Sequence, residues 1–571
     1  MQRSLILAAL LSVLGALAPE RAAAGGFYLA DRGVRPLGRG GAFVAGADDP
    51  HALWYNPAGL AWSGDQLLID ASLSLFEVSF TRIDGGGNAL PTVTGHHAYA
   101  PIPTVAGSFS IDELPNFTFG LGLMAPNSVL LEWPQSITVD GMEQPAPQRY
   151  SLLSLEGSFL STAILAAAWR PIEELSVGLS THFLFGNFDA QVALSACDGV
   201  ICSFPEDPEY DGVAKISLPT FFPFFVLGAT VDLDVVRIGA SVATPFNVEG
   251  SARIQVRPPS AAAFSGAQVV NRSPGCDWEN PNAPCRGDTR GDVQLEFPWV
   301  LRLGVEARPV AGLRLEAAVV YETWSVQDEA RIRPRDVWIE GALGGGLEYQ
   351  VGPLNVPRHM NDTVSLRLGG AYTVDEVVTI RAGGYWENGA FADPYLTPLT
   401  LDSDKVVVGG GVAIHFSREF SLDLLGGYVW MASRTVRDSA VPQPNPIRPP
   451  GNEAEVVYVG NGDYSMGAPF FGLGIRWRGD SGHVGGPSEA EPDAHGPAEP
   501  EVEATPAAET DAPEPEAPTG PNVPWYLQGR AGGGEGSTAT PESEPAVPAV
   551  EPEEEREERP RRRRRPRRRR R

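Results

Sequence analysis

The segment VTIRAGGYW, residues 378–386, decides the fold class of this chain. Its apolar residues, among them Val378, Ile380 and Trp386, alternate with polar ones such as Thr379 and Arg381. Successive side chains of a β-strand point to opposite faces, so this period of two predicts a strand with one apolar and one charged face. The same alternation recurs in residues 301–308, 365–369 and 405–416.

Alternation of this kind predicts fourteen strands along the chain. They are centred on residues 66–82, 102–112, 117–125, 150–169, 175–190, 215–232, 236–256, 293–308, 312–326, 362–373, 377–388, 405–417, 421–431 and 464–478.

The connections between these strands differ in length. Segments such as 170–174, 309–312 and 374–376 are short, whereas 257–292, 327–361 and 432–463 are long. Short turns on one rim and long loops on the other are typical of antiparallel outer-membrane β-barrels. Aromatic residues near strand ends are expected in the interfacial girdles of such a barrel, namely Trp169, Tyr321, Trp324, Trp386, Tyr428, Trp430 and Trp477.

A secreted β-sandwich is the competing fold, because its strands also alternate. Two features favour the barrel. Several predicted strands exceed the ~9 to 11 residues that cross a bilayer at a tilt, and the polar faces carry charges of both signs. We therefore expect an all-β transmembrane antiparallel barrel of about 14 strands.

The N-terminus predicts export from the cytoplasm. Residues 1–24 combine a basic start at Arg3, the apolar run 5–18 and small residues before Gly25, which is the pattern of a cleaved signal peptide. No later window is long and apolar enough for a membrane-spanning helix. The formal net charge of −27 over 571 residues makes the chain a poor binder of nucleic acid.

Residues 479–571 differ in kind from the predicted barrel. They are rich in Pro, Glu, Ala and Gly, so we expect a disordered acidic tail. The tail ends in 559–571, which holds eleven Arg and two Pro. An even strand count places both termini in the periplasm, where this run could contact anionic surfaces.

The four cysteines form two close pairs, Cys197 with Cys202 and Cys276 with Cys285. Both pairs lie in segments of loop composition, and in an oxidising compartment each is expected to form a disulfide. Zinc binding is the alternative, but neither pair has a CxxC spacing or a nearby His to complete a tetrahedral site. The sequence predicts no metal site and no cofactor.

An outer-membrane enzyme is a rival class of function. A hydrolase site at the rim of the barrel is compatible with the eight histidines, of which His96 and His97 are adjacent. However, the chain has neither a GxSxG motif nor a metal-ligand spacing, so no catalytic residue is predicted. A general porin is the second rival.

The segment GGFYLADRGVRPLGRGGAFVAGADDPHALWYNPAGLAW, residues 25–62, resembles the plug of the FadL-type family of outer-membrane transporters. Its most specific element is NPAGL at 56–60, preceded by the acidic pair Asp48-Asp49. The resemblance extends through DTVSLRLGGAYTVDE at 362–376 to the last predicted strand, FFGLGIRWRG at 470–479.

The resemblance implies a fourteen-stranded barrel over residues 64–478 and an N-terminal hatch over residues 25–63 that plugs its lumen. It also implies passive transport of a hydrophobic ligand, a long-chain fatty acid or an aromatic hydrocarbon, from the outside to a site near the hatch. The ligand would then leave sideways through a gap in the barrel wall, in contact with outer-membrane lipid.

Within the hatch, the turn at Asn56-Pro57 is expected to be rigid, because Pro57 fixes its own φ and restricts Asn56. The apolar residues of the hatch are expected either to contact the ligand or simply to pack the plug; they are Phe27, Leu29, Phe43, Trp54 and Tyr55.

Alternation assigns a set of charged residues to the polar face of the strands, namely Arg302, Glu306, Arg314, Glu316, Arg367, Arg381 and Asp423. Ion pairs between neighbouring strands that fill the lumen are the favoured interpretation. The alternative is that an arginine binds a fatty-acid carboxylate, with Arg367 and Arg381 as the first candidates. The aromatic run 221–225 is expected to face lipid, or else to line a hydrophobic path.

Overall fold

The computed structural model describes residues 31–97, 101–125, 131–197, 202, 204, 206–273, 289–342, 347–446 and 456–479. The predicted signal peptide, residues 25–30 of the predicted hatch and the predicted tail from residue 480 lie outside the described residues. So does the expected disulfide between Cys276 and Cys285.

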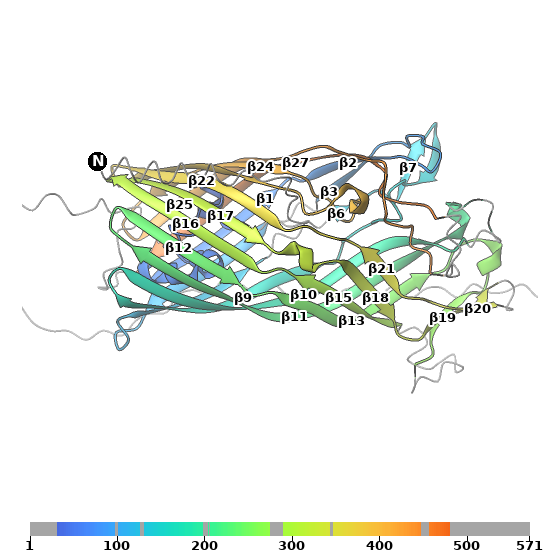
Figure 1. The fold of residues 1–571 in the computed structure, drawn as a ribbon, viewed down its shortest axis with the longest axis horizontal. Helices are drawn as coiled ribbons and strands as arrows, with labels where there is room; N and C mark the ends of the chain where they lie inside the picture. The colour runs from blue at the N-terminus through green and yellow to red at the C-terminus, as the bar shows by residue number, and fades with distance from the viewer. Residues whose placement is uncertain are drawn as a thin grey trace, which may run out of the picture. The chain divides into compact units, whose positions relative to one another are not determined.

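The described strands build one closed antiparallel barrel of fourteen strands, several of them composed of two consecutive segments (Figure 1). In chain order they are β1 (Gln66–Ser74) with β2 (Glu77–Arg82), β3 (Val93–His97) with β4 (Ile102–Ser110), β5 (Phe117–Met124) with β6 (Leu131–Glu132), β9 (Phe159–Ile172), β10 (Leu175–Ser195), β11 (Asp211–Asp232), β12 (Val236–Ala243) with β13 (Phe246–Arg257), β15 (Arg290–Phe297) with β16 (Val300–Val310), β17 (Leu313–Glu322) with β18 (Glu329–Pro334), β21 (Leu354–Pro357) with β22 (Thr363–Val374), β23 (Val378–Glu387), β24 (Lys405–His415), β25 (Phe420–Met431) with β26 (Arg434–Val436), and β27 (Gly462–Arg478).

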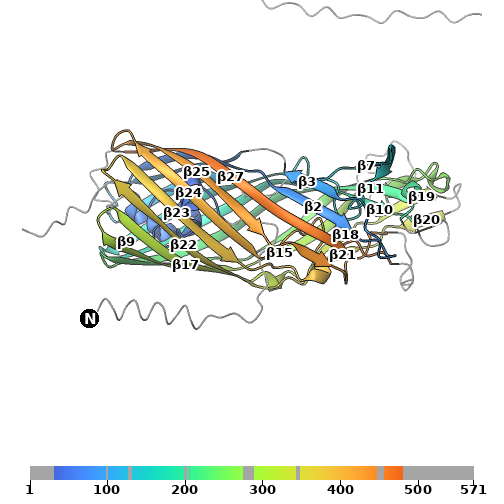
Figure 2. The same ribbon diagram turned by 90° about the horizontal axis from the view of Figure 1, so that it is seen from above.

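The last strand closes the barrel. β27 pairs with β25 on one side and with β1 on the other, in a register that sets Gln66 opposite Arg478 and Ser74 opposite Phe470. Figure 2 shows β22, β23, β24, β25 and β27 crossing the wall at a common tilt. Because both edges of the sheet are paired, no backbone edge is left open where the first and last strands meet.

Burial in the strands is inverted relative to a water-soluble protein. In β23, Ile380 is 52% exposed whereas its neighbour Arg381 is 2% exposed; in β22, Leu368 is 64% exposed and Arg367 is 3% exposed. Apolar side chains on the outer surface and charged ones inside suit a surrounding bilayer and exclude the sandwich, whose apolar face would form the core. Among the described residues, no helix is long and apolar enough to span a membrane.

Some predicted boundaries were wrong. The strand expected over 150–169 begins only at Phe159, because the chain turns at Gly157, whose φ is +90°. The long connections 257–292, 327–361 and 432–463 also carry strands, including β18, β21 and β26. Of the expected girdle residues, Trp324 is 7% exposed and lies inside the barrel rather than in a girdle.

Further elements lie among the loops. Two small sheets there consist of β14 (Gln268–Asn271), β19 (Val337–Ala342) and β20 (Leu347–Gln350), and of β7 (Ser136–Val139) with β8 (Met142–Pro145). The 3₁₀ turns are η2 (Pro208–Tyr210), η3 (Ala262–Phe264), η4 (Trp324–Val326) and η6 (Asp393–Tyr395).

Residues 31–63 form a plug inside the lumen. It contains the short helices α2 (Val34–Gly38) and α3 (Ala52–Tyr55) and the 3₁₀ helix η1 (Pro57–Trp62). Figure 1 shows these coils enclosed by the strands, towards the end of the barrel away from β7, β19 and β20. All but two of the residues 31–63 are buried.

Candidate functional site

Glycines of the barrel wall let the plug backbone approach closely. A Cβ at Gly383 would lie 2.2 Å from the carbonyl oxygen of Arg39, and a Cβ at Gly239 would lie 2.6 Å from that of Val44. On the plug side, Gly40 adopts a φ of +60° beside Gly384. Plug and wall are therefore in direct backbone contact where these glycines occur.

Buried ion pairs join the plug to one side of the wall. Arg39 Nη2 lies 2.8 Å from Glu306 Oε2 and 3.1 Å from Glu316 Oε2. Glu316 also accepts hydrogen bonds from the backbone N–H groups of Val44 and Ala45 at 2.7 and 2.8 Å. The charges expected to pair strand with strand thus pair largely with the plug.

The acidic pair of the plug extends this network. Arg314 Nη1 lies 2.6 Å from Asp48, and Arg35 Nη1 lies 2.8 Å from Asp48 and 2.9 Å from Asp49. Burial alone would raise the pKa of Asp48, but these arginines, with Arg237, lower it to about 2.

His51 bridges two carboxylates. Its Nδ1 lies 3.0 Å from Asp49, and its Nε2 lies 2.8 Å from Asp70 of β1. Burial by itself lowers the pKa of His51, but the two carboxylates outweigh burial and raise this pKa from 6.5 to about 9. At neutral pH His51 is therefore a cation that ties the plug to the first strand.

Asn56 is the polar anchor of the NPAGL turn. Its Nδ2 donates to Val44 O and to Thr230 Oγ1, both at 2.9 Å, and its Oδ1 accepts from the N–H of Ala58 at 3.2 Å. With Pro57 at the first position of η1, Asn56 caps that helix and holds it against β11.

The other residues expected to contact ligand are mostly packed within the plug. Phe43 lies against Tyr55 with ring centroids 5.6 Å apart, and the Tyr55 hydroxyl donates to Arg32 O at 2.9 Å. Of the three that the structure describes, only Trp54 lines the cavity discussed below. Phe27 and Leu29 lie outside the described residues, so their role stays a prediction.

The two arginines expected as carboxylate contacts are engaged by the chain itself. Arg367 pairs with Asp31 of the plug, and Arg381 pairs with Asp423 of β25. The remaining lumen charges named from the sequence are also paired. For Arg302, which lines the cavity, no ion pair within 4.0 Å is found among the residues that the structure describes. Whether Arg367 and Arg381 also meet a ligand stays a prediction.

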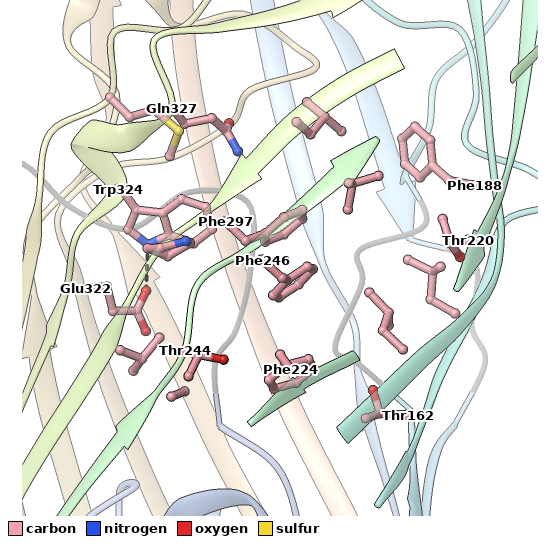
Figure 3. Close-up of a pocket in the computed structure, with 18 of the residues that line it drawn as sticks. Thr162, Phe188, Thr220, Phe224, Thr244, Phe246, Phe297, Glu322, Trp324 and Gln327 are labelled. Carbon is pink, nitrogen blue, oxygen red and sulfur yellow. Dashed lines mark hydrogen bonds between the residues drawn. The ribbon is translucent and has the colours of Figure 1, made fainter. Parts of the chain in front are cut away.

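A cavity of about 280 Å³ lies inside the barrel next to the plug. Apolar side chains make up most of its wall, including Leu160, Leu184, Val226 and Val248. Its polar groups are few, among them Thr162, Thr220, Thr244 and Gln327, which Figure 3 shows around its margin. An apolar cavity with sparse polar groups is the usual form of a site for a small hydrophobic molecule.

One wall of the cavity continues as an aromatic ladder, composed of Trp54, His182, Phe224, Phe246, Phe297 and Trp324. Adjacent ring centroids are separated by 5.3, 4.6, 5.0, 4.4 and 6.2 Å in that order. Figure 3 shows Phe224, Phe246 and Phe297 stacked one above the other, with Trp324 next to Phe297. The ladder leads from the plug to the loop after β17.

Sequence reasoning missed most of this ladder. Phe224 belongs to the aromatic run 221–225, and alternation divides that run: Phe221 is 66% exposed and Phe224 is 7% exposed. Phe221 thus lies on the outer surface of the barrel, and Phe224 lines the cavity. The signal that could have identified Phe246 and Phe297 is their position next to a break between paired strand segments, at β12–β13 and β15–β16.

Two further expectations concern chemistry. Cys197 and Cys202 are joined by a disulfide.

Ser180 Oγ lies 2.8 Å from His182 Nε2, which resembles half of a hydrolase site, but neither side chain has exposed surface. Both groups also lie within hydrogen-bond distance of Leu53 O, so the pair anchors helix α3.

Comparison with known proteins agrees with this geometry. The family model described as "Outer membrane protein transport protein (OMPP1/FadL/TodX)" matches residues 15–457. The chain belongs to this family. No curated protein sequence matches the chain.

Two solved structures of the family share the fold. A Pseudomonas aeruginosa FadL homologue aligns with a TM-score of 0.60 at 16% identity, over 79% of this chain and 99% of that chain. The Pseudomonas putida toluene transporter TodX aligns with a TM-score of 0.51 at 16% identity, over 79% and 98% of the two chains. The resemblance inferred from residues 25–62 is therefore confirmed, and the chain is an outer-membrane protein of a family of transport proteins rather than enzymes.

Proposed function

We propose that this chain carries hydrophobic small molecules passively across the outer membrane, with long-chain fatty acids and aromatic hydrocarbons as the candidate classes. The observation that carries the proposal is the apolar cavity and its aromatic ladder, inside a lumen whose other walls are charged. TodX, a structural neighbour, is described as a toluene transporter.

Physical chemistry favours this use of the cavity. Moving apolar surface out of water is favourable by about 25 cal/mol per Å². The polar headgroups of the outer membrane and a water-filled pore both oppose the passage of such a solute, whereas an apolar cavity inside a barrel supplies a stopping point between them. The buried plug argues against an open, general porin.

We further propose that the solute leaves sideways through the barrel wall near the start of β9. The strand pairing between β5 and β9 ends with Met124 opposite Thr162. Both Leu160 and Thr162 line the cavity. Beyond Thr162, no strand pairs with this edge of β9 in the part of the chain that the structure describes, and such an edge would give the solute a route from the cavity into the bilayer. Residues 126–130, which follow β5, lie outside the described residues.

The orientation of the barrel in the outer membrane is part of the same proposal. An even number of strands returns the chain to the side on which it entered, and we propose that both termini face the periplasm. The arginine-rich end of the tail would then meet anionic surfaces of the cell envelope there.

Uptake of labelled solutes tests the proposal. Gram-negative cells that lack their own transporter would express the chain and receive a labelled long-chain fatty acid, a labelled alkylbenzene or a labelled sugar. We expect uptake of at least one hydrophobic solute and no increase for the sugar.

A matched pair of variants links uptake to the cavity. Ala243 lines the cavity, whereas Val242, the preceding residue in β12, points away from it. Ala243→Phe fills part of the cavity and should abolish uptake, while Val242→Phe should not. Equal uptake by both variants would show that the solute does not use this cavity.

A further inference from the structure

A basic patch lies on the outer surface of the barrel, beyond the part of the wall that faces acyl chains. We define the patch as Lys215 of β11, Arg253 and Arg257 of β13, Arg290 of β15, Arg333 of β18 and Arg335 directly after β18. All six residues have exposed surface. Figure 1 shows β11, β13, β15 and β18 side by side in the half of the barrel away from the plug.

The register of the sheet brings these cations together. Arg253 is paired with Arg290, and the backbone N–H of Arg335 donates to Arg290 O at 2.7 Å. Three arginines therefore form one row across three neighbouring strands. Arg333 lies in the next row, opposite Asp292. Since like charges directly opposite each other in a sheet are destabilising, an anion bound between Arg253 and Arg290 would offset a cost that the sheet carries.

The patch is strongly positive, although the formal net charge of the whole chain is −27. Residues 213–217, 253–257, 290–292 and 333–335 contain six basic residues and one acidic residue, Asp292. Asp292 pairs with Arg335, and Asp189 of β10 lies 3.5 Å from Lys215. Six cations against these two carboxylates leave four positive charges in excess.

The outward-facing apolar residues show where the patch lies relative to the bilayer. Phe221 and Phe225 of β11 are exposed, which suits contact with acyl chains. Arg253 is paired with Ser217, which lies about 13 Å along β11 from Phe221 at 3.3 Å per residue. Glu249, an exposed residue of β13, lies between the patch and this apolar belt. The patch therefore faces the zone of sugars above the acyl chains.

The chemistry of that zone complements the patch. In the outer leaflet of an outer membrane it is occupied by the sugar core of lipopolysaccharide, which carries phosphate groups. Arginine donates two parallel charge-assisted hydrogen bonds to a phosphate and keeps its charge at any physiological pH. Adjacent strands lie about 4.8 Å apart, so one phosphate can accept hydrogen bonds from both Arg253 and Arg290.

We propose that the basic patch docks the phosphorylated sugar core of lipopolysaccharide, and that Arg253 and Arg290 bind one core phosphate between them. The other four cations of the patch hold neighbouring anionic groups of the same core. This inference concerns the lipid around the barrel rather than the solute inside it. It rests on one part of the proposed function, the orientation that places the long loops outside the cell.

Binding of lipids to the purified full-length protein in a non-ionic detergent tests the assignment, with EDTA present so that no divalent cation bridges the phosphates. Three probes are lipids: rough lipopolysaccharide with a phosphorylated core, rough lipopolysaccharide whose core lacks the phosphates, and phosphatidylglycerol. Inorganic phosphate is the fourth probe and separates a free anion from a lipid headgroup. Native mass spectrometry counts the bound molecules at each probe concentration.

We expect the wild type to bind the phosphorylated core about 10-fold more tightly than each of the other three probes. Arg253→Gln with Arg290→Gln should lose about 10- to 30-fold of affinity for the phosphorylated core and keep its affinity for the core without phosphates. Arg418→Gln with Arg437→Gln is the matched control, because it removes the same charge from two exposed residues outside the patch.

Three results would overturn the inference. They are equal wild-type affinity for the two cores, equal wild-type affinity for the phosphorylated core and either phosphatidylglycerol or inorganic phosphate, and equal affinity of the patch variant and the control variant for the phosphorylated core. The first two need no variant, so a failure of the patch variant to fold does not remove the test.

Labelling of Gly85→Cys on intact cells with a membrane-impermeant maleimide, compared with the wild type, tests the orientation separately. Gly85 follows the first strand of the barrel, and the patch begins on the end of the sixth strand and the seventh, which meet at the same rim because antiparallel strands alternate in direction. No labelling would overturn both the orientation and this inference. Labelling without a preference among the lipids would overturn this inference alone, and the proposed transport would stand.

Discussion

Arg39 of the plug lies 2.8 Å from Glu306 of β16, and neither side chain has any exposed surface. The two residues are 267 positions apart in the chain. Arg39 also lies 3.1 Å from Glu316, so one guanidinium bridges two carboxylates on neighbouring strands. The plug is thus held to the wall by buried charge as well as by shape.

Removing Arg39 should therefore loosen the plug. Arg39→Met removes the cation that pairs with Glu316, whereas Glu306 keeps Arg314 at 2.8 Å. Breaking a buried ion pair from one side destabilises a protein by about 3–5 kcal/mol. We expect a lower unfolding temperature in detergent and a higher permeability to small sugars. Arg434→Met is the control, because its partner Asp393 is 50% exposed. Unchanged permeability in Arg39→Met would show that other contacts suffice to hold the plug.

Stability should fall with rising pH through His51. A pKa raised from 6.5 to about 9 means that the folded state binds the proton more tightly than the unfolded state. The stabilisation, at most about 3 kcal/mol, is complete below about pH 6.5 and is lost as the pH rises to about 9. Unfolding temperatures between pH 6 and pH 10 should decline more steeply for the wild type than for His51→Gln. Parallel curves for the two proteins would contradict the ion pairs of His51 with Asp49 and Asp70.

Gly40 should tolerate no side chain. Its φ of +60° disfavours any other residue by about 1 kcal/mol, and a Cβ there would lie 2.0 Å from the backbone nitrogen of Gly384. We expect Gly40→Ala to lower the yield of assembled barrel, measured by the heat-dependent shift in gel mobility. Gly85→Ala adds the same methyl group where nothing lies within 4 Å and should behave as the wild type. Normal assembly of Gly40→Ala would mean that the plug can retract from the wall.

A disulfide between plug and wall can separate lateral exit from release past the plug. A Cβ at Gly38 would lie 3.8 Å from the Cβ of Arg381, which suits a disulfide. In Gly38→Cys with Arg381→Cys, the added change Asp423→Asn removes the carboxylate that would lose its partner. If the solute leaves sideways, uptake should be the same in the oxidised and reduced forms. Uptake that depends on reduction in this variant, but not in the wild type, would instead require movement of the plug.

The sequence was most informative where the relevant property is local. Alternation such as that of Ile380 and Arg381 reports which face of a strand meets lipid, since each residue's direction follows from the pleat alone. The segment 56–60 likewise carries its own turn and cap, because Asn56 and Pro57 are adjacent to the helix that they start. Charge on the lumen face was predictable for the same reason.

The partners of those charges were not predictable. Arg367 was expected to face the lumen, and it does, but its partner Asp31 is 336 positions away in the plug. Trp324 was expected at the membrane interface and instead ends the aromatic ladder, since the chain leaves the strand after Glu322 and turns inward through η4.

The sequence by itself determined the barrel and the direction of each strand residue, because period and turn chemistry depend on neighbouring residues. The plug followed from the resemblance of residues 25–62 to the FadL-type family. The tertiary structure alone decided which charges neutralise one another, where six aromatic rings from separate segments meet, and that Arg302 faces an apolar cavity. Those properties depend on the register and closure of the sheet, which bring together residues hundreds of positions apart.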